Sequence, residues 1–442
     1  MDRRTFMIAS ATMALPNIAR AQSAPTRIVF WHSMTAVLGE EVNRLCDTFN
    51  SSQSAIQVQP LFRGGYAESM TAAIAAWRAG QAPHLVQVFE VGTGSMLGAG
   101  PAVRQIWELS QETGIDIDPA VFIPAVRGYY SLTDGRLASM PFNSSTAVMF
   151  YNKDSFEKAG LDPETPPATW KHVIAAAQAI RASSAAAIPM TTSWPVWIQL
   201  EQFGAIHDLP YATQANGFDG LDAELLINTE HYVAQVQRLL DMAKDGTFRY
   251  GGRDNSADAM FPSGQAAMSF NSSSVRSDIA RTANFRWGTA MLPYDPAVID
   301  QPINSIIGGA SLWPMTTPNR TPEEYKAVAS FLLFLSQPEN VASWSKNTGY
   351  VPVTVAGYEL MRQQGFFKEN PGADVPIEQL TRGTMTKNSM GFRLGRMAEL
   401  RNIISEELER ALQGAQSAQA AMDVSVRRGN RVLRDFQRTQ RS

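Results

Sequence analysis

The hydrophobic positions of the first ninety residues follow two alternating periods. Apolar stretches at 28–31, 56–62 and 85–89 predict three strands. Between them, apolar residues at 38–49 and 70–77 recur at helical spacing and predict two amphipathic helices. Pro60 within the second strand places that strand at a sheet edge or marks a strand end. The order strand, helix, strand, helix, strand predicts a parallel sheet with right-handed crossovers.

Polar and aromatic residues follow directly after each of these three strands, at 31–33, 64–66 and 90–93. In open parallel sheets, ligands bind beyond the carboxyl ends of the strands. We therefore expect a binding site at this rim, with Tyr66 and Glu90 as its strongest candidates. The alternative is that such residues stand at strand ends without any function.

The rest of the chain predicts a second αβ block and a helical tail. A strand is expected at 147–151, helices at 155–159 and 170–181, a short strand within 261–275, and a strand at 306–313 that contains a glycine pair. Glycines inside a strand let a ligand or another backbone approach closely. Thr321 to Glu324 form a capping box with proline at the first helical position, which predicts the start of a helix. Two further helices are expected between residue 400 and the end of the chain.

Length, charge and cysteine content exclude several classes of protein. A length of 442 residues allows two or three domains. The net charge of −3 argues against nucleic-acid binding through a basic surface. The single cysteine, Cys46, excludes an intrachain disulfide and any cysteine-cluster metal site. No internal stretch is long and apolar enough to predict a membrane span.

Residues 1–21 have the three parts of an export signal. A twin-arginine pair at positions 3 and 4 precedes an apolar run at 6–16, and Ala19-Arg20-Ala21 fits a cleavage site. We predict a Tat-like signal peptide and a soluble periplasmic protein. The alternatives are export by the general route, or a cytosolic protein with an apolar start.

Catalytic motifs are missing from the chain. The five histidines show no paired metal-binding spacing, and neither a GxSxG elbow nor a P-loop occurs. Gly92-Thr93-Gly94-Ser95 lacks the last glycine of a dinucleotide-binding loop. We therefore predict a binding protein with no catalytic residue, no metal site and no cofactor.

Long stretches of the chain resemble a known family, namely 30–34, 87–93, 141–146, 197–201, 307–313 and 370–374. Through them the chain is similar to the solute-binding proteins of bacterial ABC importers, and among these to the branch that binds glycerol phosphates. The resemblance implies an α/β, two-lobed periplasmic-binding-protein fold of type II, with discontinuous lobes joined by hinge strands and the ligand in the cleft. It implies an N-terminal lobe of residues 22–139 and 289–343, and a C-terminal lobe of residues 140–288 and 344–442.

The resemblance also implies nine ligand-binding residues: Tyr66, Glu90, Ser145, Trp194, Trp197, Ser272, Gly309, Tyr350 and Arg401. Arg401 can offer a guanidinium to a phosphate, whereas Glu90 can accept hydrogen bonds from glycerol hydroxyls. This predicts phosphate toward Arg401 and hydroxyls toward Glu90. The two tryptophans offer apolar walls and a face for a choline cation. Alternatively, the tryptophans are core residues and Arg401 forms a surface ion pair with Glu406 or Glu407.

The predicted function is capture of sn-glycerol-3-phosphate, or of a glycerophosphodiester such as glycerophosphocholine, for an inner-membrane ABC permease. We expect a monomer that binds no nucleic acid. One alternative is a binding protein for a neutral sugar or oligosaccharide. The other is a secreted phosphodiesterase or glycosidase that uses Glu90 as general acid or base.

Overall fold

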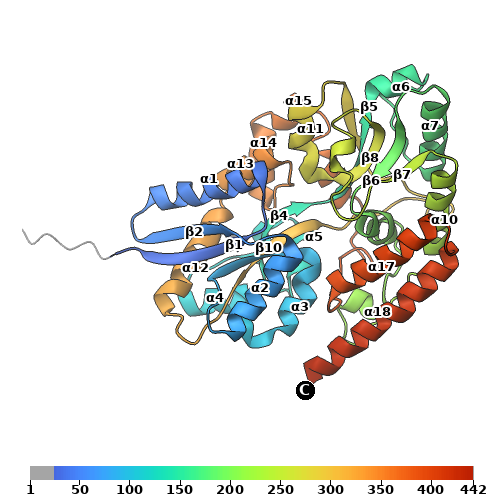
Figure 1. Ribbon diagram of the computed structural model, residues 1–442. Coiled ribbons are helices and arrows are strands. Elements are labelled where there is room, and N and C mark those ends of the chain that lie inside the picture. Colours follow the sequence, from blue (N-terminus) through green and yellow to red (C-terminus); the bar gives the residue numbers. More distant parts are fainter. Residues whose placement is uncertain (1–23, 442) are drawn as a thin grey trace, which may run out of the picture.

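The computed structural model describes residues 24–441 and divides their strands between two five-stranded sheets (Figure 1). The first sheet has the order β2-β1-β3-β10-β4. Its strands are β1 (Thr26–His32), β2 (Ile56–Phe62), β3 (Leu85–Phe89), β4 (Met140–Ser145) and β10 (Gly308–Pro314). β1 is parallel to β2 and β3, and β10 is antiparallel to β3 and β4. The predicted parallel unit and the edge position of the proline-containing strand β2 are both confirmed.

The first long helix after β1 buries one apolar stripe. In α1 (Ala36–Ser52), the buried residues Val42, Leu45, Cys46 and Phe49 recur at helical spacing. The Thr321 hydroxyl accepts a hydrogen bond from the Glu324 N–H, and the Glu324 carboxylate accepts one from the Thr321 N–H, which confirms the predicted capping box. The elements are α1 (Ala36–Ser52), α2 (Tyr66–Arg78), α3 (Thr93–Gly98), α4 (Ile106–Thr113), α5 (Pro124–Tyr130), α12 (Pro322–Leu335) and α13 (Pro338–Thr348).

The second sheet has the order β7-β6-β8-β5-β9. Its strands are β5 (Ala147–Asn152), β6 (Ile188–Thr192), β7 (Phe248–Tyr250), β8 (Ala266–Ser272) and β9 (Trp287–Ala290). β6 is parallel to β7 and β8, whereas β5 is antiparallel to β8 and β9. The helices of this part include α6 (Lys153–Lys158), α7 (Trp170–Ala182), α10 (Glu230–Lys244), α11 (Arg276–Thr282), α17 (Met397–Leu412) and α18 (Ala418–Arg441).

Further helices lie between these elements along the chain. They are α8 (Phe203–Ile206), α9 (Thr213–Gly217), α14 (Val355–Gln363), α15 (Phe366–Glu369), α16 (Val375–Leu380), and a π-helical turn at Trp197–Gln202. The terminal helices α17 and α18 pack against each other and against α10, and they form the red hairpin in Figure 1. None of the helices within residues 24–441 has both the length and the apolar character needed to cross a membrane.

The chain passes between the two sheets at Thr146 and again between β9 and β10. Thr146 is fully buried, and its hydroxyl lies 2.8 Å from the carbonyl oxygen of Ile306, so the two crossing segments contact each other. Sheet membership differs from the expected lobe limits, because β4 lies in the first sheet and β9 ends at Ala290 in the second. Every residue from 140 to 152 is buried, so the hydrophobic pattern carries no mark of the crossing. The full lobe limits stay a prediction.

Candidate ligand-binding site

A pocket between the two sheets gathers all nine residues that the sequence singles out. Its lining also includes Phe89, Ser274 and Gly308, which sequence reasoning did not name as ligand contacts. Each of these three stands beside a predicted residue, in the strand end, the serine cluster or the glycine pair. That the nine residues contact a ligand stays a prediction. The full lining is Tyr66, Phe89, Glu90, Ser145, Trp194, Trp197, Ser272, Ser274, Gly308, Gly309, Tyr350 and Arg401.

The first-sheet wall of the pocket (Tyr66, Phe89, Glu90, Ser145, Gly308 and Gly309) consists mainly of strand ends. Tyr66 begins α2 directly after β2, and its ring stacks on that of Phe89 with 5.5 Å between centroids. The Asn143 side-chain amide donates a hydrogen bond of 3.0 Å to the Tyr66 hydroxyl. Burial raises the pKa of Tyr66 well above its usual value, so the phenol stays protonated.

Gly309 occupies a position that only glycine fits. Its φ is +92°, and a Cβ atom there would lie 1.9 Å from the backbone oxygen of Asn143. The pairing of β10 with β4 shifts register just beyond it, between Ala310 and Ser311. Because Gly309 has no side chain, its backbone can lie close to that of Asn143 at the pocket lining, near Ser145.

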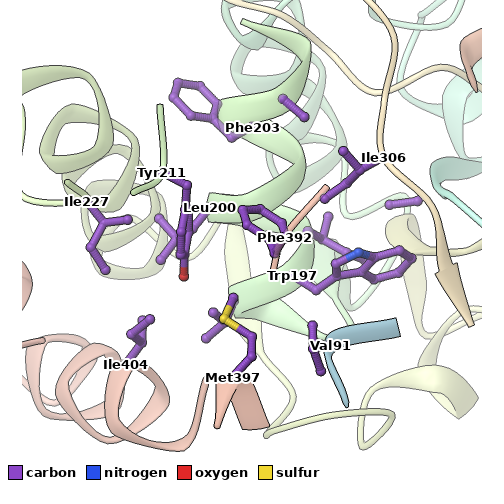
Figure 2. Packing of buried hydrophobic residues seen from close by; sticks show 14 of the residues in the cluster. Val91, Trp197, Leu200, Phe203, Tyr211, Ile227, Ile306, Phe392, Met397 and Ile404 are labelled. Carbon is purple, nitrogen blue, oxygen red and sulfur yellow. The ribbon is translucent and has the colours of Figure 1, made fainter. Parts of the chain in front are cut away.

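The second-sheet wall (Trp194, Trp197, Ser272 and Ser274) rests largely on irregular backbone, since only Ser272, the last residue of β8, belongs to a strand. Trp194 follows β6 with a φ of +48°, a left-handed conformation that costs a bulky residue about 1–3 kcal/mol. Trp197 opens the π-helical turn, and a Cβ on Gly308 would lie 2.4 Å from its indole ring. Figure 2 shows Trp197 among buried residues that include Val91 and Ile306. Trp197 is therefore both a core residue and a pocket residue, and the two interpretations of it are compatible.

The serine cluster supplies hydroxyl groups to the same wall. The Ser272 and Ser274 hydroxyls lie 2.8 Å apart, and the Ser274 N–H donates to the Ser272 hydroxyl at 3.3 Å. The Ser272 N–H donates in turn to the side-chain oxygen of Asn271 at 2.7 Å. This arrangement directs neutral hydrogen-bonding groups into the pocket at the end of β8.

Arg401 joins the two walls through two carboxylates. Its Nε and Nη2 atoms each lie 2.7 Å from an oxygen of Glu201, and Nη2 also lies 2.8 Å from Oε1 of Glu90. The Glu201 side chain is fully buried, and that of Glu90 is 6% exposed. Glu90 comes from the end of β3, Glu201 from the π-helical turn and Arg401 from α17. The structure thus adds a residue, Glu201, that sequence reasoning quoted only as part of a matching stretch.

Glu90, Glu201 and Arg401 form a triad in which opposite charges stabilise one another. Burial raises the pKa of Glu90, and the adjacent Arg401 guanidinium opposes this rise. Burial works against the charged form of Arg401, but the carboxylates of Glu201 and Glu90 raise its pKa well above the usual value. Arg401 is therefore a permanent cation.

The alternative interpretation of Arg401 as one half of a surface ion pair is wrong. It does not pair with Glu406 or Glu407, because Arg428 holds both of these carboxylates at 2.6 and 2.7 Å. The predicted orientation, with phosphate toward Arg401 and hydroxyls toward Glu90, stays a prediction. Because the two side chains are in direct contact, it requires the phosphate and the hydroxyls to lie side by side.

Within residues 24–441, no three His, Cys, Asp or Glu side chains lie close enough together to hold a metal ion. Cys46 is buried and unpaired in α1, and burial raises the pKa of its thiol. The chemistry that the pocket offers is hydrogen bonding, one buried cation and aromatic surface.

Comparisons with known proteins agree with this geometry. Residues 44–372 match the family model for bacterial extracellular solute-binding proteins. The sn-glycerol-3-phosphate-binding periplasmic protein UgpB of Pectobacterium atrosepticum is 43% identical over 440 residues, covering 99% of this chain and 98% of that protein. UgpB from Mycobacterium tuberculosis in complex with glycerophosphocholine has a TM-score of 0.76 at 20% identity, over 94% of this chain and 100% of that one. Maltose-bound MalE3 of T. maritima has a TM-score of 0.72 at 18% identity, over 92% and 100%.

The chain belongs to the bacterial extracellular solute-binding protein family. Its two mixed sheets with flanking helices form the two-lobed α/β fold of periplasmic binding proteins, which confirms the predicted fold class. Family membership makes it a binding protein and not an enzyme, so the alternative of a phosphodiesterase or glycosidase is set aside.

Proposed function

We propose that this chain is the periplasmic substrate-binding component of an ABC importer and that it captures sn-glycerol-3-phosphate or a glycerophosphodiester such as glycerophosphocholine. The observation that carries the proposal is the gathering of one buried guanidinium, several hydroxyls and two tryptophans around one pocket between the sheets. The names of the UgpB relative and of the neighbour bound to glycerophosphocholine support the same ligand class.

The phosphate group is assigned to the side of the pocket that carries hydroxyls. Ser145, Ser272, Ser274 and Tyr350 bring hydroxyl groups to the lining. Within the described residues, the Nη1 atom of Arg401 makes no hydrogen bond, because the contacts to Glu90 and Glu201 use Nε and Nη2. Nη1 is thus free to donate to a phosphate oxygen, which is a strong, charge-assisted interaction.

The glycerol and any head group are assigned to the remaining surface. Glu90 is an acceptor for glycerol hydroxyls, and because it touches Arg401, the hydroxyls and the phosphate bind side by side. Trp194 and Trp197 pack against the carbon skeleton. The face of Trp194, which is less buried than Trp197, can hold a choline cation by cation–π attraction.

Closure of the two sheets on the ligand would complete the cycle. The crossings at Thr146 and between β9 and β10 join the sheets and can act as hinges. The closed monomer then docks on an inner-membrane permease. The periplasmic location rests on the names of the relatives and on the export signal expected at residues 1–21, which lies outside the described residues.

Thermal unfolding of residues 22–442 with different ligands tests the proposal. A ligand at 100 times its dissociation constant stabilises the folded state by about 2.7 kcal/mol, which raises Tm by several degrees. We expect this shift with sn-glycerol-3-phosphate and with glycerophosphocholine, and none with maltose. A larger response to glycerophosphocholine implicates the tryptophans.

The double variant Ser145→Ala/Ser272→Ala tests the phosphate assignment. It should lose most of the thermal shift, because both hydroxyls are placed at the phosphate. A shift with maltose alone would leave the fold standing and refute the phosphate assignment in favour of a neutral sugar.

A further inference from the structure

The loop of residues 251–260 lies outside the pocket lining, yet it is bonded to the segments that carry pocket residues. Oδ1 of Asp258 accepts a hydrogen bond of 2.5 Å from the Ser193 hydroxyl. The same oxygen accepts one of 2.9 Å from the Asn271 side-chain amide. Ser193 immediately precedes Trp194, and Asn271 immediately precedes Ser272. One carboxylate oxygen therefore contacts both Ser193, which precedes Trp194, and Asn271, which precedes Ser272.

The first of these contacts holds the backbone that presents Trp194. The Ser193 N–H donates to the Phe270 carbonyl at 3.0 Å, and the Trp194 N–H donates to the Asp254 carbonyl at 2.6 Å. Because the Ser193 hydroxyl also donates to Asp258, hydrogen bonds hold both the backbone and the side chain of Ser193. A strained residue persists only where its surroundings over-determine its conformation. These bonds supply that restraint for the left-handed backbone of Trp194.

The second contact decides how the Asn271 side chain is oriented. An ionised carboxylate only accepts hydrogen bonds, so the NH₂ group of Asn271 must point toward Asp258. This leaves the Asn271 side-chain oxygen to accept from the Ser272 N–H at 2.7 Å. The orientation of Asn271, and through it the position of Ser272, therefore depends on the carboxylate.

The same loop is tied to the helix that carries Arg401. The Arg253 guanidinium donates from Nε to Glu409 at 2.8 Å and from Nη2 at 2.5 Å, and Glu409 lies on α17. Gly252 permits the turn, with a φ of +114° and Ser256 Cβ only 2.8 Å from where its own Cβ would be. Across the described residues, no lysine or arginine forms an ion pair with Asp258, and burial raises the pKa of its carboxyl. Its stabilising contacts are thus the hydrogen bonds to Ser193 and Asn271.

We propose that Asp258 is a positioning residue for ligand binding, which touches no ligand itself and sets Trp194 and Ser272 in place through Ser193 and Asn271. This inference rests on the proposed function, and it adds a specificity-determining residue outside the pocket. Because both connections meet at one oxygen atom, removal of Asp258 should disturb the tryptophan and the serine together.

The test compares Asp258→Ala, Asp258→Asn and the control Asp254→Asn by calorimetric titration with sn-glycerol-3-phosphate. Asp258→Ala should weaken affinity by about tenfold or more, because both connections are lost. Asp258→Asn should stay within about threefold, because its amide oxygen can accept both hydrogen bonds. Asp254 is exposed, and the bond to Trp194 uses its backbone oxygen, so Asp254→Asn should bind as wild type does.

A double-mutant comparison separates positioning from a general loss of stability. In a Trp194→Ala/Ser272→Ala background, adding Asp258→Ala should change affinity by less than about twofold, because the residues through which it acts are gone. A full additional loss in that background would overturn the inference. So would a lower Tm for Asp258→Ala with unchanged affinity, since that is the result of a purely structural role.

A measurement without ligand keeps the two proposals distinguishable. The near-UV circular dichroism of Trp194 is obtained as the difference between a protein and its Trp194→Phe variant. Asp258→Ala should abolish this difference signal, and Asp258→Asn should retain it. If the wild-type protein binds neither sn-glycerol-3-phosphate nor glycerophosphocholine, the proposed function fails. The circular dichroism signal then decides the role of Asp258, because an unchanged signal in Asp258→Ala refutes that role.

Discussion

The two walls of the pocket differ in what holds their side chains in place. In the first-sheet wall, Tyr66, Glu90 and Gly309 stand at or beside strand ends, where ladder hydrogen bonds and a buried core determine the backbone. In the second-sheet wall, Trp194 has a left-handed backbone and Trp197 opens a π-helical turn. Side-chain hydrogen bonds hold the segment that carries Trp194, and only Ser272, the last residue of β8, belongs to a strand ladder. The first-sheet wall is therefore sensitive to packing, whereas the tryptophan side of the other wall is sensitive to single polar groups.

The largest expected effect lies at Arg401, the residue that joins the walls. Arg401→Ala leaves the buried carboxylates of Glu90 and Glu201 without their cation, which should cost about 3–5 kcal/mol of unfolding free energy. Affinity for a glycerol phosphate should fall by about 100-fold or more. Urea unfolding and calorimetric titration measure the two losses.

Arg410→Ala is the matched control on the same helix. Arg410 is mostly exposed and lies 3.9 Å from Glu407, so its removal should cost at most about 0.5 kcal/mol. If the urea midpoint of Arg401→Ala equalled that of Arg410→Ala, the contacts of Arg401 with Glu90 and Glu201 would not be what connects the walls.

The next effect breaks the first-sheet wall by packing. Gly309→Ala places a Cβ atom against the Asn143 backbone oxygen and forces an unfavourable φ, which should cost about 3 kcal/mol in thermal or urea unfolding. Gly365→Ala has a similar φ of +75° but open space around the added atom, and should cost about 1 kcal/mol. Equal losses for the two variants would show that the close approach at Gly309 is unimportant.

A smaller effect sharpens the role of Tyr66. Tyr66→Phe keeps the stacking on Phe89 but removes the acceptor for the Asn143 amide, which should cost about 1–2 kcal/mol. Tyr358→Phe removes a hydroxyl from a partly exposed ring that packs on Phe367, and should be nearly neutral. Urea denaturation of both variants distinguishes a hydrogen-bonding role of the Tyr66 hydroxyl from a purely aromatic one.

The smallest effect is a pH dependence at the junction of the walls. The pKa of Glu90 is already raised by burial, and an anionic ligand beside it raises this pKa further, so binding takes up protons. Affinity for glycerophosphocholine should therefore increase as pH falls toward the Glu90 pKa, by less than about tenfold per pH unit, the limit for one proton.

The phosphodiester of glycerophosphocholine does not titrate in this range, so the dependence reports on the protein. Arg401, Glu201, Tyr66 and Tyr350 face the same region, but Arg401 and the tyrosines keep their protons there. Glu90→Gln should flatten the profile. A slope that persisted in Glu90→Gln would assign the proton to another group.

The contrast between the walls also explains what could be predicted from the sequence. The first sheet follows from hydrophobic periodicity, and the strand-end rule for parallel sheets points to Tyr66 and Glu90. The other seven of the nine predicted residues come from the family resemblance. The glycine pair inside a strand is a local hint of a close approach, but no local pattern marks a serine, a tryptophan or an arginine as part of a pocket. Hydrophobic periodicity predicts no strand at Met140–Ser145, where β4 lies, because this strand buries polar residues along with apolar ones.

The residues that sequence reasoning missed act through long-range contacts. Glu201 meets an arginine that is 200 positions away in the chain. Asp258 acquires its role only when the loop, β6 and β8 come together. Neither residue type nor spacing announces such pairs, and the direct contact of Glu90 with Arg401 likewise could be seen only in the fold.

One calorimetric titration tests the central claim most directly. sn-Glycerol-3-phosphate is titrated into residues 22–442, with the Arg401→Ala and Arg410→Ala variants in parallel. The account predicts saturable binding of one ligand per chain in wild type and in Arg410→Ala, and its loss in Arg401→Ala. Saturable binding that is unchanged in Arg401→Ala, or no binding of the glycerol phosphate alongside binding of maltose, would contradict it.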